Sequence, residues 1–448
     1  MKAEPISEAD RYHSIERRIL GISSPGIRPG LSRMARLCSL LGHPERTFPA
    51  VHVIGTNGKG SVCASIDSIL RESGCRTARY TSPHLEHLGE RLTFDNQPLP
   101  PSMWEEAVEQ VSEAILSDRM LSEDPPSFFE NLTAAAFLCI ARGKRDFAVI
   151  EAGLGGRLDA TNLLGRVHGT VFTSIGLDHE DILGRGLECI AKEKFAALRP
   201  RVPAVSASNG NFLDELVEEA SRRLDSPLCI LGKNAWVFPY TVGRTGSTFR
   251  LCRDGFPPLD LSTPLLGKHQ VVNAGLAALA CLGLSGDWPR MNEDAIREGL
   301  RKTVWPGRME VVALNPPVLL DGAHNPQGAE MLAGNVRSLW PETPVALVMA
   351  AMKDKDLEGM LRALSLLGGN LFCTEVPGLD RSETAQGLAK KALSLPWPGK
   401  VRAFSDPEEA LLEASGTSPL VLCTGSLYFI GRIRRHLIKK CTGTEAQG

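Results

Sequence analysis

The sequence predicts an α/β protein built on mostly parallel β-sheets. Short apolar runs rich in β-branched residues alternate with longer segments of helical periodicity, which is the pattern of repeated β-α-β units. The expected strands are Val51–Ile54, Phe147–Ile150, Thr170–Ile175, Val318–Leu320, Val345–Met349 and Leu420–Cys423. The expected helices are Gly60–Ser73, Met103–Leu116, Asn131–Arg142, Leu187–Leu198 and Asn273–Leu284. In such folds, ligands bind where the strands end.

The composition is that of an ordinary globular protein, with 43% hydrophobic and 23% charged residues in a chain of 448. The formal net charge of −2 gives no basic field for nucleic acid, and no stretch reaches the ~18 apolar residues of a membrane helix. The polar N-terminal segment Met1–Asp10 contains no signal region. The eleven cysteines form no C-x-x-C pair, so we expect reduced thiols and a cytoplasmic location.

A chain of this length is expected to form two or three domains. The segment 228–265 carries short strand-like pieces broken by Gly and Pro, which predicts a small β insertion. The Pro/Gly break at Val304–Gly307 follows a helix and precedes new strands. We therefore predict one domain over residues 1–303 and a second over residues 304–448.

The motif with the clearest chemistry is VHVIGTNGKGS, residues 51–61, where an apolar strand enters a glycine-rich loop and a helix follows. Glycines let backbone N–H groups face an anion, the helix N-terminus and Lys59 add positive charge, and Ser61 can ligate magnesium. The pattern departs from the strict phosphate-loop motif, because Val53 is not a glycine and Gly60 separates Lys59 from Ser61. A glycine-rich turn without a ligand is the alternative, but the order of strand, loop, lysine and helix favours a triphosphate site.

Two further polar groups follow apolar strands. Glu151 ends the run DFAVIE, where a carboxylate near a phosphate loop suits a magnesium ligand, although a turn carboxylate has the same pattern. His179 follows the run TVFTSI within Gly-Leu-Asp-His-Glu, and a structural histidine is about as common there as a ligand. The following run Lys192–Lys194 would by itself be a solvated helix face.

The segment Leu320–Pro326 repeats this arrangement in the second predicted domain, with Asp321 and His324 after an apolar strand. An Asx turn is the alternative. The density of polar residues after a wholly apolar strand makes a functional site at least as good an interpretation.

In order along the chain, the motifs GTNGKGS, EAGLGGRLDATN, LDHEDILG, GKHQVVNA, PGR, DGAHNP, MKDKD and TGSLY resemble those of the bacterial folylpolyglutamate synthase and dihydrofolate synthase family of Mur ligases. The resemblance spans roughly residues 20–435. It implies a P-loop-like ATPase domain with a mostly parallel sheet and a smaller C-terminal Rossmann-like α/β domain, with ATP and a pterin substrate in the cleft between them. The implied reaction joins L-glutamate to dihydropteroate, or to the γ-carboxylate of a folate, and releases ADP and phosphate.

The resemblance also implies roles for individual residues. The implied phosphate and nucleotide contacts are Thr56, Asn57, Gly58, Lys59, Gly60, Ser61, Asn273, Arg308 and Asp321. The implied ligands of two Mg²⁺ sites are Ser61, Ser82, Glu151 and His179. The implied pterin contacts are Ser127, Phe128, Phe129, Glu130, Leu158, Asp159 and Ala160, and His324 and Ser426 fall near the incoming glutamate.

Lys194 stands where the family carries a carbamylated lysine, and together with Lys59, Asp321 and His324 it is expected to be catalytic. The family usually continues Ala-Gly-Ile, whereas this chain continues Phe195-Ala196-Ala197. A carbamate would replace a positive charge beside two metal ions with a negative one. Two magnesium ions and Lys59 would neutralise the phosphates, and Asp321 or His324 would deprotonate the glutamate amine before it attacks the acyl phosphate.

Other functions remain as alternatives. A Mur ligase acting on a cell-wall nucleotide precursor normally has a longer N-terminal domain, and only 54 residues precede Gly55 here. A nucleotide-binding switch would not need both DGAHNP and a second metal-site histidine. The sequence leaves open whether the enzyme makes dihydrofolate, extends polyglutamates or does both, and we expect both. By resemblance alone it is expected to be a monomer with small-molecule substrates.

Overall fold

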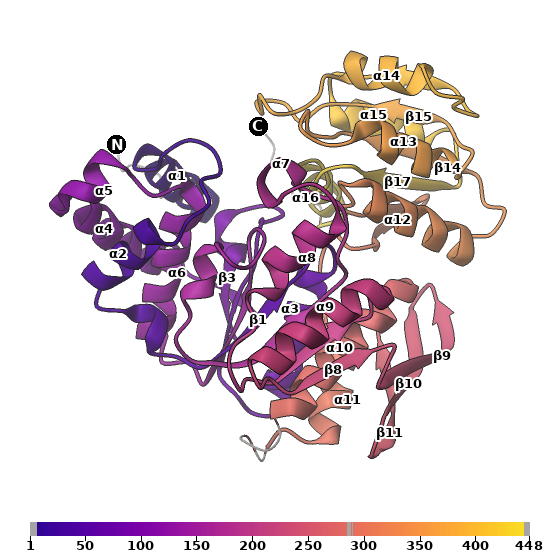
Figure 1. Cartoon of the computed structure of the whole chain (residues 1–448). Helices are drawn as coiled ribbons and strands as arrows, with labels where there is room; N and C mark the ends of the chain where they lie inside the picture. The colour runs from indigo at the N-terminus through magenta and orange to yellow at the C-terminus, as the bar shows by residue number, and fades with distance from the viewer. Residues whose placement is uncertain (1–6, 285–287, 289, 443–448) are drawn as a thin grey trace. The chain divides into compact units, whose positions relative to one another are not determined.

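In a computed structural model, the chain is described over residues 7–284, 288 and 290–442. Two compact units share these residues. Within the described ranges, the first comprises residues 7–240, 248–264, 270–284, 288 and 290–304, and the second comprises residues 241–247, 265–269 and 305–442. Each unit is an α/β structure on its own sheet, which confirms the predicted fold class (Figure 1).

Over the described residues, the larger sheet has eleven strands in the order β11-β10-β9-β8-β7-β6-β1-β5-β2-β3-β4. Its strands are β1 (Ala50–Ile54), β2 (Thr77–Tyr80), β3 (Leu92–Phe94), β4 (Gln97–Pro98), β5 (Phe147–Glu151), β6 (Val167–Phe172), β7 (Ala204–Ala207), β8 (Leu228–Leu231), β9 (Ala235–Gly243), β10 (Gly246–Arg253) and β11 (Phe256–Thr263). The strands from β8 to β2 pair in parallel, and β3 and β4 are antiparallel. Residues 228–265, expected as a small insertion, form β8–β11 and continue this sheet.

The helices of the first unit pack on the large sheet and on one another. They are α1 (Glu8–Gly21), α2 (Ser32–Leu40), α3 (Lys59–Glu72), α4 (Pro101–Ser117), α5 (Arg119–Glu123), α6 (Phe128–Gly143), α7 (Glu180–Leu183), α8 (Leu187–Phe195), α9 (Asn211–Arg223), α10 (Lys268–Leu284) and α11 (Glu293–Arg301). Ala50 and Ile54 of β1 join cores with α6 and with α8 and α9, respectively. All five residues of β1 are buried, as expected for a central parallel strand.

The smaller sheet has the order β12-β13-β17-β14-β15-β16 within the described residues, with only the pair β12–β13 antiparallel. Its strands are β12 (Glu310–Leu314), β13 (Pro317–Leu320), β14 (Val345–Met349), β15 (Leu371–Cys373), β16 (Val401–Ala403) and β17 (Leu420–Thr424). Its helices are α12 (Pro326–Leu339), α13 (Leu357–Ser365), α14 (Ala385–Leu393), α15 (Pro407–Ser415) and α16 (Leu427–Thr442).

Several expected boundaries were wrong, among them the start of α10 at Lys268 rather than Asn273 and the end of α8 at Phe195 rather than Leu198, and two others have an identifiable reason. The strand predicted to reach Ile175 ends at Phe172, because the next residues bond to the loop after β1 instead. The helix expected from Asn131 begins at Phe128, because Ser127 and Glu130 form a capping box in which each side chain accepts from the other residue's backbone N–H.

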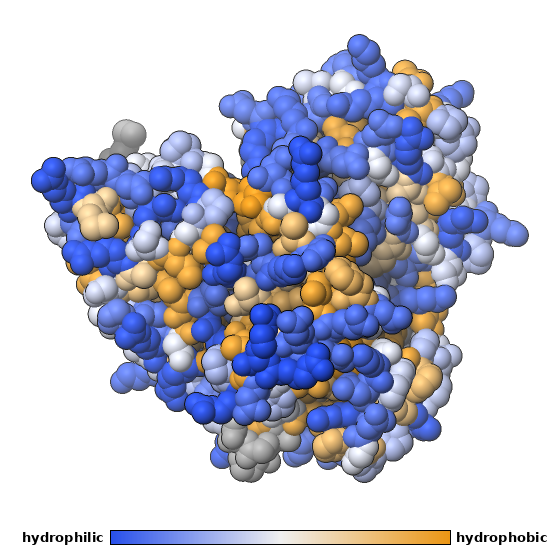
Figure 2. Space-filling view, in the orientation of Figure 1, coloured by the Kyte–Doolittle hydropathy of each residue, from blue (hydrophilic) through white to orange (hydrophobic). Residues whose placement is uncertain are grey.

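Hydrophilic side chains cover most of the face seen in Figure 2. None of the helices in the described residues is long and apolar enough to cross a membrane. The ten cysteines whose side chains are described are all free thiols.

Close packing of α11 on α3 gives a first prediction. A Cβ on Gly299 would lie 2.4 Å from the backbone Cα of Ile69, whereas a Cβ on Gly334, exposed in α12, would meet nothing within 4 Å. Both glycines are inside helices, where alanine is intrinsically better by about 1 kcal/mol. We expect Gly299→Ala to lower the free energy of unfolding by about 1–3 kcal/mol and Gly334→Ala to raise it by about 0.5–1 kcal/mol.

Chemical denaturation of the two variants measures this difference. If Gly299→Ala stabilises the protein as much as Gly334→Ala does, the contact between α3 and α11 is not as close as described.

Candidate active site

The loop between β1 and α3 is shaped to receive an anion. Gly58, the residue before α3, has a left-handed backbone with φ of 88°, and no side chain caps the helix there. A Cβ on Gly55 would lie 1.8 Å from Thr173 Oγ1, so only glycine fits at the strand end. The first N–H groups of a helix carry partial positive charge and need an acceptor. An uncapped N-terminus next to Lys59 therefore suits phosphate.

The segment after β6 is bound to this loop. The Thr56 N–H donates to Ser174 O at 2.8 Å, and the Ser174 hydroxyl donates to Asn57 O at 3.2 Å. Thr56 Oγ1 accepts from the Gly176 N–H at 3.1 Å and lies 3.2 Å from Gly176 O. Two motifs more than one hundred residues apart in the chain are thus joined, and Asp178 and His179 follow directly.

Glu151, at the end of β5, lies beside the same loop. Its carboxylate is 4% exposed, and one oxygen lies 3.9 Å from Lys59 Nζ. The other oxygen accepts from the Ser82 N–H at 3.2 Å. Lys59 Nζ also donates to Thr56 O at 3.1 Å. The structure therefore brings together Lys59, Ser82 and Glu151, and their roles in holding phosphate and metal stay predictions.

Lys194 is buried rather than part of a solvated helix face. Its Nζ donates to Gly55 O at 2.8 Å, and the residue is 4% exposed in the last turn of α8. Burial, together with the positive charge of Lys59, lowers the pKa of Lys194 to about 7, while Asp178 and Asp159 oppose this change. Lys192, two residues earlier, is exposed and pairs with Glu188, so the solvated-face interpretation holds for that lysine only.

His179 lies at the start of α7. Its backbone is left-handed with φ of 54°, and its carbonyl accepts from Ile182 and Leu183. Its Nε2 lies 3.8 Å from Asp178 Oδ1, and a third of the side chain is exposed. Over the described residues, three or more His, Cys, Asp or Glu side chains nowhere gather in a metal-binding arrangement. A metal at this edge would take further ligands from hydroxyl groups, water and bound phosphates, which is the usual coordination of Mg²⁺.

The glycine-rich loop after Glu151 packs on α8. A Cβ on Gly156 would lie 2.8 Å from Lys194 O, and the Arg157 N–H donates to Glu193 O at 2.8 Å. Asp159, buried at the start of the 3-10 helix η3 (Ala160–Leu163), accepts from the Leu154 N–H at 2.7 Å. Burial raises the pKa of Asp159. The loop is thus fixed by its own carboxylate and by the helix that carries Lys194.

Of the residues predicted to contact a pterin, some cap a helix and others are partly buried side chains. Ser127 and Glu130 are buried in the capping box of α6, whereas Phe128 and Phe129 are only partly buried. The Phe129 ring occupies the space where a Cβ on Gly153 would lie, and the Arg91 guanidinium is 5.6 Å from the Phe128 ring centre. Leu158 is partly buried and Ala160 is buried in the neighbouring loop.

Two polar residues that support the candidate site were not predicted from the sequence. His52, buried in β1, lies 2.8 Å from Thr161 Oγ1, and that hydroxyl in turn donates to Asp159. Burial lowers the pKa of His52 to about 3, so the ring is neutral and supports the loop by hydrogen bonding. Gln270 of α10 donates to Ser61 Oγ and accepts from Asn273. His52 stood inside an expected strand without a sign of its contact, and the motif GKHQVVNA contained Gln270 without indicating its contact.

In the second unit, Asp321 follows β13 and is buried. Its two oxygens accept from the Met309 N–H at 2.9 Å and the Ala323 N–H at 2.8 Å. Burial raises the pKa of Asp321, and the charge of Arg308 opposes this rise. A Cβ on Gly322 would lie 2.2 Å from Arg308 Nη1, so the glycine leaves room for the guanidinium.

His324 and Ser426 lie at the same edge of the smaller sheet. His324 Nδ1 is 2.8 Å from Gly322 O. Strand β17 neighbours β13, and the Gly425 N–H donates to Ala323 O at 3.1 Å, which places Ser426 beside the Asp321 loop. Ser426 is buried at the start of α16. The structure therefore groups Arg308, Asp321, His324 and Ser426 within the second unit.

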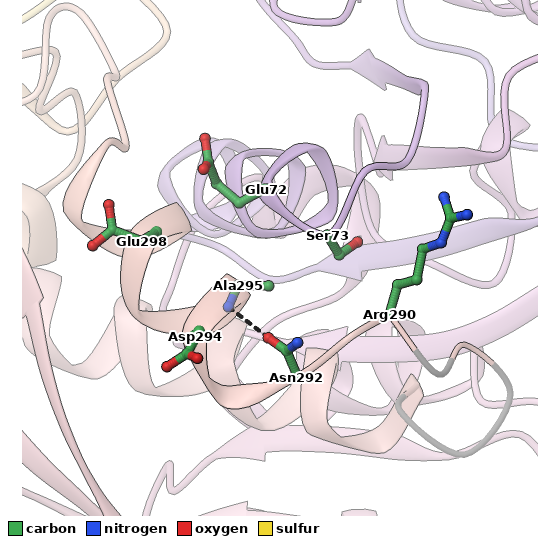
Figure 3. Close-up of a pocket in the computed structure, with 7 residues that line it drawn as sticks. All are labelled: Glu72, Ser73, Arg290, Asn292, Asp294, Ala295 and Glu298. Atoms are coloured by element: carbon green, nitrogen blue, oxygen red, sulfur yellow. Dashed lines mark hydrogen bonds between the residues drawn. The ribbon is translucent and has the colours of Figure 1, made fainter.

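A separate pocket of about 400 Å³ lies at the far end of α3 (Figure 3). Its lining residues are Glu72, Ser73, Arg290, Asn292, Asp294, Ala295 and Glu298. Helix α3 has 14 residues and is about 20 Å long, so this pocket is remote from the phosphate loop. Its polar groups support the fold: Asn292 caps α11 by accepting from the Ala295 N–H, and Glu72 pairs with Lys302.

Comparison with known proteins agrees with this geometry. Residues 53–282 match the Mur ligase middle domain and residues 307–427 match the Mur ligase glutamate ligase domain. The chain is 35% identical over 419 residues to the dihydrofolate synthase/folylpolyglutamate synthase of Bacillus subtilis (strain 168), covering 92% of this chain and 96% of that protein. The Escherichia coli (strain K12) protein of the same name is 30% identical, with 92% of each chain covered.

Solved structures show the same similarity. The folylpolyglutamate synthase of Mycobacterium tuberculosis complexed with ADP aligns with a TM-score of 0.87 and 29% identity, covering 96% of this chain and 99% of that one. E. coli FolC in complex with DHPP and ADP aligns with a TM-score of 0.85 and 27% identity, covering 98% of this chain and 100% of that one. The chain belongs to the Mur ligase family, within its dihydrofolate synthase/folylpolyglutamate synthase group, whose members are ATP-dependent, ADP-forming ligases.

Proposed function

We propose that this protein ligates L-glutamate to dihydropteroate and to the γ-carboxylate of tetrahydrofolates, with ATP activating the acceptor carboxylate as an acyl phosphate. The observation that carries the proposal is the uncapped N-terminus of α3, with Lys59 beside it and the buried Glu151 carboxylate 3.9 Å from the lysine. That set offers cationic and main-chain donors for phosphates and a carboxylate for a divalent cation. The B. subtilis and E. coli relatives carry both activities in their names.

The residues fit a magnesium–nucleotide complex. Thr56–Ser61 would hold the phosphates through backbone N–H groups and Lys59, while Ser61, Ser82, Glu151 and His179 would supply oxygen and nitrogen ligands for two metal ions. Magnesium supplies neutralisation of phosphate charge during transfer. The carboxylate of Glu151 is available for this role because its neighbours orient it: the Ser82 N–H holds one oxygen, and Lys59 faces the other.

His324 is better suited than Asp321 to deprotonate the glutamate amine. A carbonyl oxygen can only accept, so the short contact between His324 Nδ1 and Gly322 O requires a proton on Nδ1. In the neutral ring, Nε2 is then the basic atom. Both oxygens of Asp321 already accept backbone N–H groups, which suits an orienting residue, and Asn273 and Arg308 would contribute nucleotide contacts.

Lys194 is proposed to be carbamylated. Nucleophilic attack on CO₂ requires the neutral amine, and a pKa of about 7 makes that form abundant near neutral pH. The Nζ lone pair would form the N–C bond and one proton would be released, so the group becomes an anion. This charge change would convert repulsion by Lys59 into attraction and could orient a second metal ion or its waters.

The acceptor would lie against Phe128, Phe129 and the loop containing Leu158, Asp159 and Ala160. The partly buried aromatic rings suit stacking on a pterin, and the fixed loop beside them offers main-chain polar groups.

The proposal includes a monomeric cytoplasmic enzyme, for which free thiols fit a reducing compartment. Sedimentation analysis that gives a dimer mass would contradict the monomer.

The reaction is tested by offering dihydropteroate and tetrahydrofolate separately, each with ATP, Mg²⁺ and labelled glutamate. We expect label to enter both acceptors, with one ADP and one phosphate released for each glutamate added. Glu151→Gln keeps an acceptor for the Ser82 N–H but removes the anionic ligand, so turnover should fall at least ~100-fold with little change in melting temperature.

Glu188→Gln, which changes an exposed carboxylate paired with Lys192, is the matched control and should keep wild-type turnover. Label in neither acceptor would refute the ligase function. Near-wild-type turnover by Glu151→Gln would refute only the metal role of that residue.

Carbamylation is tested by ¹³C NMR of active enzyme supplied with ¹³C-bicarbonate. We expect one protein-bound carbamate resonance that is absent from Lys194→Met and retained by Lys192→Met. An active wild-type enzyme without this resonance would show that Lys194 works as an unmodified amine.

The lowered pKa of Lys194 also predicts how stability depends on pH in bicarbonate-free buffer. The unfolded lysine keeps its proton up to its ordinary pKa of 10.5, whereas the folded one loses it above about 7. The unfolded state therefore binds more protons between these values, and raising the pH favours folding. The free energy of unfolding of wild type minus that of Lys194→Met should rise over pH 7–10, by at most ~1.4 kcal/mol per pH unit. Denaturant titrations at several pH values that give a constant difference would contradict it.

A further inference from the structure

Gln270 lies in the N-terminal turn of α10 and contacts the nucleotide-binding helix α3. Its side-chain Nε2 donates to Ser61 Oγ at 3.2 Å, and its Oε1 accepts from Asn273 Nδ2 at 3.0 Å. Gln270 is 1% exposed and Ser61 is 2% exposed, so water does not compete for either bond. Ser61 is the residue in the third position of α3, where a hydroxyl faces the bound phosphates and metal in the proposed function.

The amide of Gln270 has a fixed orientation. Asn273 Nδ2 can only donate, so the Gln270 oxygen must face Asn273 and the Gln270 NH₂ group must face Ser61. Asn273 is itself held against the phosphate loop, because a Cβ on Gly58 would lie 2.7 Å from its Oδ1. Two hydrogen-bonded side chains, Asn273 and Gln270, thus lead from the loop glycine to the serine hydroxyl.

This bond determines what Ser61 can offer to a ligand. A serine hydroxyl has two acceptor lone pairs and one donor hydrogen. The Gln270 N–H occupies one lone pair and holds the oxygen in place. The other lone pair then remains for a cation, and the O–H hydrogen remains for an anionic oxygen.

We propose that Gln270 is a positioning residue that holds the Ser61 hydroxyl in the orientation that ligates magnesium of the bound nucleotide. This inference rests on the proposed function, because it assumes that a magnesium nucleotide binds at Ser61. If Gln270 has this role, its loss should weaken ADP binding in the presence of Mg²⁺. Binding without Mg²⁺ should change little, because the direct phosphate contacts of the loop remain.

The test is calorimetric titration of the full-length protein with ADP, once with Mg²⁺ and once with EDTA. Gln270→Met keeps the length and apolar stem of the side chain but cannot donate to Ser61. It should raise the Kd of ADP in Mg²⁺ by roughly 3- to 10-fold, the worth of one hydrogen bond, and change the Kd in EDTA much less. In the Ser61→Ala background, Gln270→Met should have no further effect on either Kd.

A second variant separates the two bonds of Gln270. Gln270→Glu keeps the acceptor for Asn273, but an ionised carboxylate cannot donate to Ser61, whereas a protonated one can. At neutral pH, where the introduced carboxylate is ionised, this variant should lose Mg²⁺-dependent affinity for ADP as Gln270→Met does. Ser221→Ala, which removes a buried hydroxyl bonded to Ser226 O in the C-terminal part of α9, controls for general loss of a buried hydrogen bond and should leave both Kd values unchanged.

The outcomes are distinct. Equal weakening in Mg²⁺ and EDTA, an undiminished effect in the Ser61→Ala background, or no weakening at all would each overturn the positioning role. Wild-type protein that binds ADP in neither condition would instead overturn the proposed function, and this inference with it.

Discussion

The hydrogen bonds between the phosphate loop and residues 174–176 are the constraint on which the first unit's site depends. Strands β1 and β6 are parallel neighbours, so both chains leave the sheet at the same edge. Their continuations then satisfy each other's backbone groups, with Thr56 bonded to Ser174 and Gly176. Without this pairing, Lys59 and the segment that carries Asp178 and His179 would be two independent loops.

The same arrangement holds Lys194 in place. It puts a second lysine, and so a second positive charge, beside the phosphate loop. Its Nζ donates to Gly55 O, the first residue of the loop, in a position from which water is excluded and where Lys59 adds a second positive charge. An isolated ammonium is costly in such a place, so the pKa of Lys194 falls to about 7 and the neutral amine is populated near neutral pH. Burying the Lys194 amine lowers the stability of the fold, whereas Lys192 stays in solvent at no such cost. Buried charged groups with shifted pKa values are typical of functional sites.

Much of this could be predicted because parallel β-α-β architecture leaves clear patterns. Buried strands such as β14 are uninterrupted apolar runs, and Glu151 and Asp321 are visible as the first charges after apolar runs. Strand and helix ends were harder. The run TVFTSI is apolar enough to continue as a strand, but its last residues bond to a loop distant in sequence. The capping box Ser127–Glu130 did leave a local signal for the start of α6.

Side-chain contacts across long sequence separations left no such signal. The pattern Lys-Glu-Lys at 192–194 has a helical period, but the period does not indicate which lysine faces the sheet. Gly156 packs on the backbone of Lys194, and this contact between distant residues helps to fix which lysine is buried. Similarly, Gln270 stands in a helix whose other residues are mostly apolar, and only the position of Ser61 in space gives it a partner.

The distances along the chain have a consequence for how this site arises. Gly55 and Lys194 are 139 residues apart, and Thr56 and Gly176 are 120 apart. Ordering contacts between such remote residues costs loop-closure entropy before any bond compensates, so they form only when the central strands are already paired. The binding geometry therefore depends on the paired central strands, and a short fragment with only the glycine-rich loop lacks the residues that hold that loop.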